Sequence, residues 1–512
     1  MKPNSTPKLF LSSVAWPVSI PLAAGVALIA IAPFHQSTAG SPVPATLSPS
    51  DSPGNSFGIV GALENGVAVI GAGYDSSTAI SAGSAYVFVR NGGAWLEQQK
   101  LTANDGAADD LFGTAVDISF RTIVVGAVFK DSRRGAAYVF VSNGSNWTQQ
   151  AKLTGVNPRL DDVFGQSVAI SADTVLVGVP GDDVVSCPNR YCDTGSVHVF
   201  VRFQGQWLRQ QILTASDAAT SDAFGSFVAI DGNTAVVGTE LAEAAYVFVR
   251  QGTTWSQQAK LTPSGTNFQG FGRAVSVHGN TIIVGAPEGF DGRLRSAGLA
   301  YVFTRTGTNW TEQAQLFSRQ PSLAARFASS VSVNGDHALI GSISGNAAEF
   351  FVRNGTSWTS VRRLTSPAGS SGFGWAVSLS AGSALVGKTD AVAAYVFAFS
   401  PVPQVNISAV DPSASEPGAN TGQFRISRIG NKDDLLRVYY QVTGAATPGG
   451  DYTPLRGFAT IEPGRVGQLF RVNPIDDTTP EPNENVKITL LPDPGYEIGP
   501  SHEAEVTITD ND

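Results

Sequence analysis

Two landmarks separated by a constant 14 residues recur seven times along this chain, and this spacing limits the folds open to it. The first landmark is Phe-Gly, with Ala328 replacing the glycine in one copy, and the second is a glycine that closes a Val/Ile run. The phenylalanines are Phe57, Phe112, Phe164, Phe224, Phe271, Phe327 and Phe373, and the glycines are Gly71, Gly126, Gly178, Gly238, Gly285, Gly341 and Gly387. Substantial length variation is confined to the connection that follows the second landmark.

Each copy continues with Ala-Tyr-Val-Phe or a variant of it, and six copies have a tryptophan nine residues after the Tyr position. The segments between landmarks alternate in hydrophobicity, are rich in β-branched and aromatic residues, and are bounded by Gly, Asn, Asp and Ser, as short strands are. Four such strands in a period of 46 to 60 residues are typical of a propeller blade. We therefore predict an all-β chain that contains a seven-bladed β-propeller of four-stranded blades, closed so that no sheet edge is exposed.

The last blade needs a strand from elsewhere in the chain. The seventh copy ends near Phe399 without a tryptophan strand, whereas Leu47 precedes Phe57 by the ten residues that separate Leu261 from Phe271. We expect the segment around residues 46–48 to supply that fourth strand.

The Phe-Gly landmark followed by Gly285-Ala286-Pro287 resembles the FG-GAP repeat, the blade unit of integrin α subunits and of many secreted bacterial proteins. The resemblance covers about two-thirds of the chain and implies a recognition scaffold outside the cell. Integrin-type calcium loops lie between the two landmarks. The constant interval leaves no room for them, so we do not expect calcium of that type in the propeller.

The N-terminal residues 1–40 are interpreted as a signal peptide, because two lysines precede an apolar run that ends before small residues around Ala39. An uncleaved membrane anchor is the alternative, although the apolar run is short for a membrane span. We expect a secreted, cell-surface or periplasmic protein with no membrane span after cleavage.

In an oxidising compartment Cys187 and Cys192 are expected to form a local disulfide.

The variable connections and the blade-to-blade loops are expected to share one face of the propeller, because successive strands of a blade run antiparallel. Loops on a rigid scaffold favour binding, so we predict a recognition surface there, above all in segments 74–84, 181–195 and 288–298. The acidic pairs before Phe-Gly are interpreted as solvated turn and cap residues. Asp182 and Asp183 are a weaker candidate site for a cation.

The acidity of the chain is concentrated after residue 400. Residues 401–512 carry 16 Asp and Glu against 8 Lys and Arg, a balance of −8, while the whole chain carries −9. Strand-like stretches predict a seven-stranded immunoglobulin-like β-sandwich at residues 405–512, after a propeller at 41–400 and a linker at 401–404. Carboxylates gathered at one end of a sandwich repel each other unless a cation neutralises them, and calcium takes such hard oxygen ligands.

The same carboxylates lie in motifs that resemble the Calx-β domain, found in sodium-calcium exchangers and many extracellular bacterial proteins. The motifs are Ser415-Glu416, Gly450-Asp451-Tyr452-Thr453, the segment 475–484, and the segment 506–512. The resemblance implies calcium as the cofactor. The ligand positions that it implies are Glu416, Asp451, Asp476, Asp477, Glu481, Asp510 and Asp512.

No catalytic residues are predicted. The Gly-x-Ser-x-Gly match at residues 54–58 lies at the start of a propeller strand rather than at a strand-to-helix elbow, and there is no basic patch for nucleic acid. We expect an exported, non-enzymatic binding or adhesion protein, a monomer, whose partner is an extracellular or cell-surface protein or glycan. The alternative is an extracellular propeller hydrolase that acts on a glycan or phosphoester through Asp182, Asp183 or Asp291.

Overall fold

The computed structural model describes residues 44–511 except for 52–55, 92–93, 184–191, 266–268, 368–370, 381, 390–392, 400–402, 417–419, 431–435, 463–464 and 493–495. Strands dominate these residues, and α1 (Lys130–Arg133) is the only helix among them. None of their helices is long and apolar enough to cross a membrane. The predicted signal peptide, Cys187 and Asp512 lie outside the described residues, so those expectations stay predictions.

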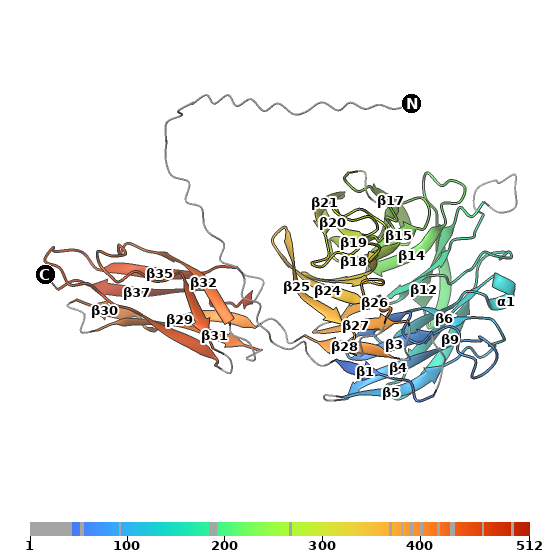
Figure 1. The fold of residues 1–512 in the computed structure, drawn as a ribbon, viewed down its shortest axis with the longest axis horizontal. Coiled ribbons are helices and arrows are strands. Elements are labelled where there is room, and N and C mark those ends of the chain that lie inside the picture. The colour runs from blue at the N-terminus through green and yellow to red at the C-terminus, as the bar shows by residue number, and fades with distance from the viewer. Residues whose placement is uncertain are drawn as a thin grey trace, which may run out of the picture. The chain divides into compact units, whose positions relative to one another are not determined.

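Seven four-stranded antiparallel sheets form the blades of a propeller, which confirms the predicted fold (Figure 1). Blade 1 comprises β2 (Gly61–Glu64), β3 (Val67–Ala72), β4 (Ser84–Asn91) and β5 (Ala94–Leu101). Blade 2 comprises β6 (Phe112–Ser119), β7 (Thr122–Ala127), β8 (Ala136–Ser142) and β9 (Trp147–Leu153). Blade 3 comprises β10 (Val168–Ser171), β11 (Thr174–Val179), β12 (Ser196–Phe203) and β13 (Gln206–Leu213). Blade 4 comprises β14 (Phe224–Asp231), β15 (Thr234–Thr239), β16 (Ala245–Gln251) and β17 (Thr254–Leu261). Blade 5 comprises β18 (Ala274–His278), β19 (Thr281–Ala286), β20 (Leu299–Thr306) and β21 (Asn309–Leu316). Blade 6 comprises β22 (Phe327–Asn334), β23 (His337–Ser342), β24 (Ala347–Asn354) and β25 (Ser357–Thr365).

Blade 7 is completed by the N-terminal segment, as predicted. It contains β26 (Phe373–Ser380), β27 (Ser383–Lys388) and β28 (Ala394–Ala398), and β1 (Ala45–Leu47) pairs antiparallel with β28. The side chain of Leu47 is buried in the cluster that joins blades 7 and 1. The ring is therefore closed by a strand that comes from the other end of the propeller sequence.

The two landmark glycines meet at the contact between adjacent blades. A Cβ atom on the second glycine would lie closer than 3.0 Å to the carbonyl oxygen of the Phe-Gly glycine in the next blade, or of Ala328. The pairs are Gly71 with Gly113, Gly126 with Gly165, Gly178 with Gly225, Gly238 with Gly272, Gly285 with Ala328, Gly341 with Gly374, and Gly387 with Gly58. Close backbone approach thus explains why the second landmark is a glycine in all seven copies.

A ring of hydrogen bonds also links the innermost strands of neighbouring blades. In six of the seven blades, a side chain near the end of the innermost strand accepts a hydrogen bond from a backbone N–H in the turn of the next blade. The bonds are Phe120 N to the Glu64 carboxylate, Ala172 N to Ser119 Oγ (3.1 Å), Gly232 N to Ser171 Oγ (3.0 Å), Gly279 N to Asp231 Oδ2 (2.6 Å), Gly335 N to His278 Nδ1 (3.1 Å) and Asn65 N to Ser380 Oγ (3.0 Å). The last of these joins blade 7 to blade 1.

The recurring tryptophans join the outermost strands of neighbouring blades. Five of the six indole Nε1 groups donate to a glutamine of the preceding blade, in the pairs Trp147–Gln98 (2.9 Å), Trp207–Gln150 (2.8 Å), Trp255–Gln210 (3.0 Å), Trp310–Gln258 (2.8 Å) and Trp358–Gln313 (3.0 Å). In four blades an arginine lies 5.2 to 5.4 Å from the tryptophan ring and donates to a threonine of the preceding blade. The aromatic landmarks therefore pack the blades together.

The C-terminal residues form a sandwich of two sheets around one apolar core. One sheet has the order β34 (Gly467–Val472), β31 (Gly422–Ile429), β29 (Gln404–Asp411), β36 (Glu497–Ile498). The other has the order β30 (Ser413–Ser415), β37 (Glu503–Thr509), β35 (Glu484–Leu490), β32 (Leu436–Thr443), β33 (Phe458–Ile461). The rings of Tyr440 and Phe470 stack at 5.2 Å and join the two sheets.

The strand count differs from the seven that we predicted. Nine strands belong to the sandwich in the described residues, because the short segments β30 and β36 each pair along an edge of a sheet. β29 begins at Gln404, inside the segment that we assigned to the linker.

Candidate metal centre

Strand directions bring four acidic segments to one end of the sandwich. β30 and β37 are parallel, with Ser415 opposite Thr509, so Glu416 and Asp510 follow them at the same end. β35 is antiparallel to β37, with Glu484 opposite Ile508, so the start of β35 lies there too. The turn that contains Asp451 is tied to the segment after β34, because Ile475 N donates to Asp451 O over 2.9 Å. Residues far apart in the sequence thus gather around one point.

Three carboxylates approach each other most closely. Asp451, Glu481 and Glu484 each have a carboxylate oxygen within 4.8 Å of those of the other two. Asp451 and Glu484 are half-buried and Glu481 is exposed. The Oε2 atom of Glu484 is buried and has no hydrogen-bond partner, which is an unfavourable state for a carboxylate oxygen in the absence of a cation.

The remaining predicted positions join this group electrostatically. Partial desolvation raises the pKa of Glu416, and the charges of Asp510, Asp477, Asp476 and Glu481 raise it further. The pKa of Glu481 is raised in the same way, by partial desolvation and then by Asp451, Asp477 and Asp510. All the predicted ligand positions that the structure describes therefore belong to one network of mutually repelling carboxylates.

Glu484 has the largest pKa shift in the group. Its pKa is raised to about 7, first by a hydrogen bond shared with the Asp451 carboxyl group, then by burial, and then by the charges of Asp451, Glu481 and Glu416. Two carboxyl groups this close share a proton because they cannot both ionise without cost. A bound divalent cation would remove that cost.

Glu484 is a candidate ligand that sequence reasoning missed. We placed it in the Calx-β-like motif but not among the ligand positions. The alternation of buried residues along β35 could have revealed it. Val486, Ile488 and Leu490 point into the core, and Glu484 lies two residues before Val486 and therefore on the same face of the strand.

Backbone groups hold several of these carboxylates in place. Thr447 N donates to Asp451 Oδ2, Thr479 N donates to Asp477 Oδ1 over 2.6 Å, and Glu481 N donates to Asp510 Oδ2 over 2.6 Å.

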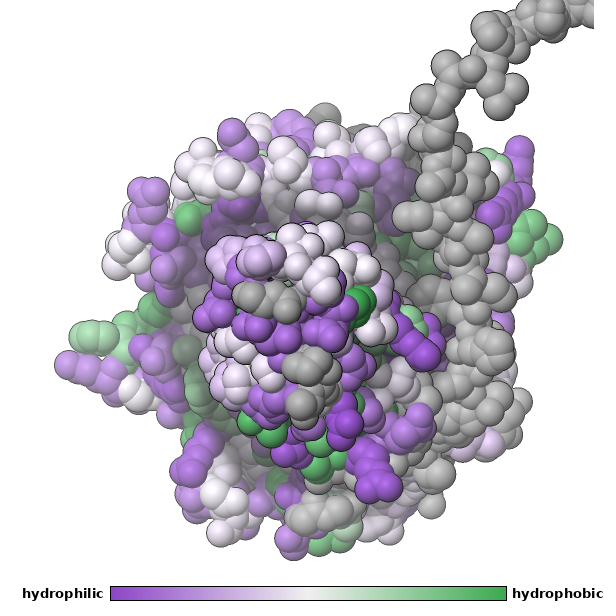
Figure 2. All heavy atoms as spheres, turned by 90° about the vertical axis from the view of Figure 1, so that its left-hand side faces the viewer, coloured by the Kyte–Doolittle hydropathy of each residue, from purple (hydrophilic) through white to green (hydrophobic). Residues whose placement is uncertain are grey.

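This end of the sandwich is predominantly hydrophilic in Figure 2. The donor atoms gathered here are carboxylate oxygens, without cysteine or histidine, and such a set fits calcium.

The predicted recognition face of the propeller is assembled as expected. Loops between the second and third strands of one blade accept hydrogen bonds from the phenylalanines that open the next. The bonds are Phe112 N to Ala82 O (3.0 Å), Phe164 N to Arg134 O (3.0 Å), Phe224 N to Thr194 O (3.1 Å) and Phe327 N to Ala297 O (2.9 Å). The variable loops and blade-to-blade loops therefore lie side by side.

The acidic residues of this face are used within the protein. Asp110, Asp162 and Asp222 each accept a hydrogen bond from the N–H three residues earlier. Asp110 and Asp162 are buried, so our interpretation of them as solvated residues is wrong. Asp182 accepts from Ser196 Oγ over 2.6 Å, and Asp183 Oδ1 accepts from Cys192 N over 2.8 Å. These bonds weaken the claim of Asp182 and Asp183 to a cation or to the alternative hydrolase.

The predicted disulfide falls partly inside the described residues. Cys192 is buried and disulfide-bonded. The pairing with Cys187 stays a prediction, because Cys187 lies outside the described residues.

Comparison with known proteins supports the repeat assignment. Four segments match the model of the FG-GAP repeat, at residues 95–140, 147–200, 207–248 and 255–303. Each match begins at a tryptophan and ends in the third strand of the following blade. The chain therefore contains FG-GAP repeats. No curated protein sequence matches it.

Three solved structures are similar to part of the chain. The apo form of the Calx CBD1 domain is 26% identical over 21% of this chain and 98% of its own, with a TM-score of 0.19. The two-domain CBD12 of CALX1.1 is 27% identical over 21% of this chain and 45% of its own, with a TM-score of 0.19. A 6-phosphogluconolactonase candidate from Bacteroides fragilis is 12% identical over 65% of this chain and 97% of its own, with a TM-score of 0.42.

Proposed function

We propose that the protein is an exported, non-enzymatic recognition protein whose C-terminal sandwich binds calcium. The observation that carries calcium binding is the close approach of the Asp451, Glu481 and Glu484 carboxylates, with a buried oxygen of Glu484 that lacks a partner. Calcium would supply the positive charge that this group of oxygens lacks.

Each residue of the cluster has a separate part in this proposal. Asp451 and Glu484 would be the central ligands, because they are half-buried and their carboxylate oxygens lie within 4.8 Å of each other. Glu481, Glu416, Asp476, Asp477 and Asp510 would add ligands or negative charge around them. Bringing together loops that precede or follow β30, β35 and β37 would stiffen this end of the sandwich.

The recognition part of the proposal rests on the propeller. FG-GAP repeats and a face built from variable loops support a scaffold that binds an extracellular or cell-surface protein or glycan. We infer export from the N-terminal sequence, and N-terminal sequencing of the mature protein tests it. A mature chain that starts near residue 40 supports a cleaved signal peptide, and a chain that retains residues 1–39 contradicts cleavage.

Thermal unfolding of the full chain with calcium or magnesium tests the metal. All eight tryptophans precede residue 376, so tryptophan fluorescence follows the propeller, whereas near-ultraviolet circular dichroism of tyrosine also responds to the sandwich. We expect millimolar calcium to raise the melting temperature of the sandwich transition, and magnesium to raise it less, because a site of carboxylates with few waters suits the larger ion. Equal transitions with calcium and with chelator would contradict the proposal.

A further inference from the structure

In three blades a lysine covers the tyrosine of the third strand. The lysine and tyrosine are opposite each other in the pairs Tyr86–Lys100, Tyr138–Lys152 and Tyr246–Lys260. The ammonium nitrogens lie 5.1, 5.8 and 5.3 Å from the ring centroids. Each nitrogen also pairs with an aspartate of the preceding connection, with Asp51 at 2.6 Å, Asp105 at 2.8 Å and Asp217 at 2.7 Å. The repeat thus contains a position for an ammonium group.

Blade 5 keeps the tyrosine and lacks both charged partners. Tyr301 is opposite Gln315 in the same register. Ser264 N donates to Glu312 just as Ser50 N donates to Glu97, so Gly265 occupies the position of Asp51. The Tyr301 hydroxyl makes no hydrogen bond with any described residue.

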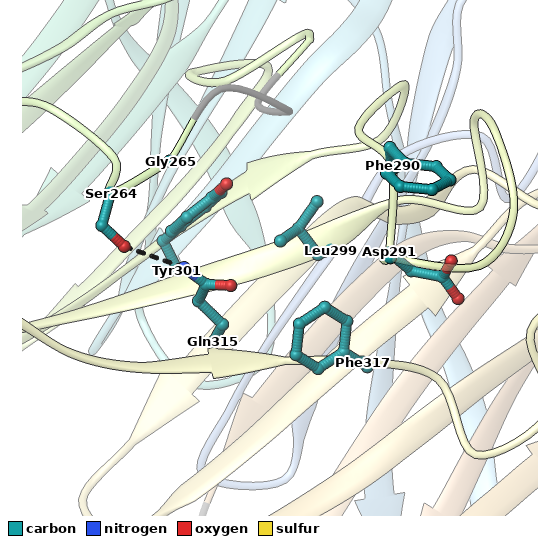
Figure 3. A pocket seen from close by; sticks show the side chains of 9 residues that line it. Ser264, Gly265, Phe290, Asp291, Leu299, Tyr301, Gln315 and Phe317 are labelled. Carbon is teal, nitrogen blue, oxygen red and sulfur yellow. Dashed lines mark hydrogen bonds between the residues drawn. The ribbon is translucent and has the colours of Figure 1, made fainter. Parts of the chain in front are cut away.

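A pocket of about 270 Å³ occupies the place of the missing charges. Phe290 and Asp291, from the connection between β19 and β20, lie on one side of it, and Tyr301 and Gln315 lie on the other, with Phe317 between them (Figure 3). Asp291 belongs to one of the variable loops that we predicted as a recognition surface. The three aromatic rings give the pocket an apolar wall.

The polar atoms of the pocket are acceptors. Asp291 Oδ1 accepts from Arg293 N (2.8 Å) and Leu294 N (2.6 Å), while its Oδ2 has no hydrogen bond or ion pair with the described residues. Gln315 Nε2 donates to Ser264 Oγ and to Glu312 Oε1, each over 3.0 Å, which leaves its Oε1 as an acceptor. Among the described residues, no lysine, arginine or histidine lines the pocket. Its lining therefore favours a cation.

We propose that this pocket binds the primary alkylammonium group of a ligand, in the position that Lys100, Lys152 and Lys260 fill in the sister blades. The ring of Tyr301 offers a cation–π contact. Gln315 Oε1 and the Tyr301 hydroxyl oxygen would accept hydrogen bonds from the ammonium group, and the carboxylate of Asp291, on the other side of the pocket, would supply negative charge. The ligand is either a free amine or a lysine side chain of a protein, which share this chemistry.

Ligand-observed NMR titration of the full chain with n-pentylammonium tests the proposal, with 1-pentanol as the neutral control. We expect saturable binding of the amine with a Kd in the millimolar range, as suits about six non-hydrogen atoms, and no saturable binding of the alcohol. A third titration uses Nα-acetyl-lysine methylamide. Equal or tighter binding of this compound identifies a lysine side chain as the ligand, and binding of the free amine alone identifies a small molecule.

Two variants place binding in the pocket. Asp291→Asn keeps the Oδ1 acceptor of the turn and removes the charge, so the affinity for n-pentylammonium falls at least tenfold. Gln315→Lys supplies the internal ammonium group of the sister blades, so binding is lost while the propeller keeps or gains thermal stability. Asp109→Asn, an exposed change on another blade-to-blade loop, leaves the affinity unchanged. Absence of saturable binding, equal binding of the alcohol, or unchanged affinity in both pocket variants would overturn the proposal.

Discussion

The carbonyl oxygen of Gly58 occupies the space that a Cβ atom on Gly387 would need. Gly58 opens blade 1 and Gly387 closes the second strand of blade 7, so this contact joins the first and last blades of the ring. The same contact recurs between the other neighbouring blades. Loss of one such contact at the closure should therefore weaken the whole propeller.

Gly387→Ala should lower the free energy of unfolding of the propeller by about 3 kcal/mol, because the new methyl group meets backbone that cannot rotate away. Urea unfolding followed by tryptophan fluorescence measures this, since the sandwich contains no tryptophan. Gly155→Ala is the matched control, because a Cβ atom there meets its nearest atoms at an ordinary 3.6 Å. Equal urea midpoints for the two variants would show that the glycine contact does not control closure.

The half-buried acid Asp117 should make the propeller less stable as pH rises from about 4 to about 7. Burial raises the pKa of Asp117 to about 7, against the N–H groups of Ile170 and Ile118, which lower it, and the charge of Glu64 raises it further. The folded state therefore holds a proton that the unfolded state releases near pH 4, and stability falls between these values. The free energy of unfolding should fall by about 2 kcal/mol over this range. A shift of three pKa units corresponds to roughly 4 kcal/mol, but water screens the charge of this half-buried side chain.

Asp117→Ser tests this pH dependence. Serine fills the same position in blades 5, 6 and 7, where Ser276, Ser332 and Ser378 each accept a backbone hydrogen bond from the next blade. We expect the variant to have a smaller drop in urea midpoint between pH 5 and pH 8 than the parent. The same drop in both proteins would assign the pH dependence to another group.

Calcium binding near pH 7 should release a proton from the carboxylate cluster. The pKa of Glu484 is raised to about 7 in the calcium-free protein, and a cation favours its ionised form, so the affinity for calcium should increase as pH rises through 7. Calorimetric titrations at pH 6.5 in buffers of different ionisation enthalpy measure the released protons. We expect up to about one proton per calcium ion in the parent and fewer in Glu484→Gln. Equal proton release in the two proteins would exclude Glu484 as the source.

Much of the propeller could be predicted because its contacts recur in the sequence. Each 14-residue interval closes on a glycine because adjacent blades meet there through backbone atoms, so each copy repeats the same constraint. The closing strand at Ala45–Leu47 was predictable because Leu47 keeps the spacing to Phe57 that other blades have. Local hydrophobic alternation alone would not have located it.

The parts that were missed depend on the neighbours of a residue in space. Glu484 reads as the first residue of a strand, and only the fold brings its carboxyl group against Asp451. The pocket of blade 5 arises from absent residues, since Gly265 and Gln315 replace a charged pair that is visible only once Tyr301 and its opposite residue are aligned in register. A search for residues that recur in every repeat does not reveal a place where a charged pair is missing.

Calorimetric titration of calcium into the full chain tests the central claim most directly. We expect a saturable site with a Kd on the order of 10⁻⁴ to 10⁻³ M, as in extracellular calcium modules. The double variant Asp451→Asn with Glu484→Gln should bind at least tenfold more weakly, and Glu505→Gln, an exposed change on β37, should bind as the parent does. No heat of binding at millimolar calcium, or equal affinity in the double variant and the parent, would contradict a calcium site at this end of the sandwich.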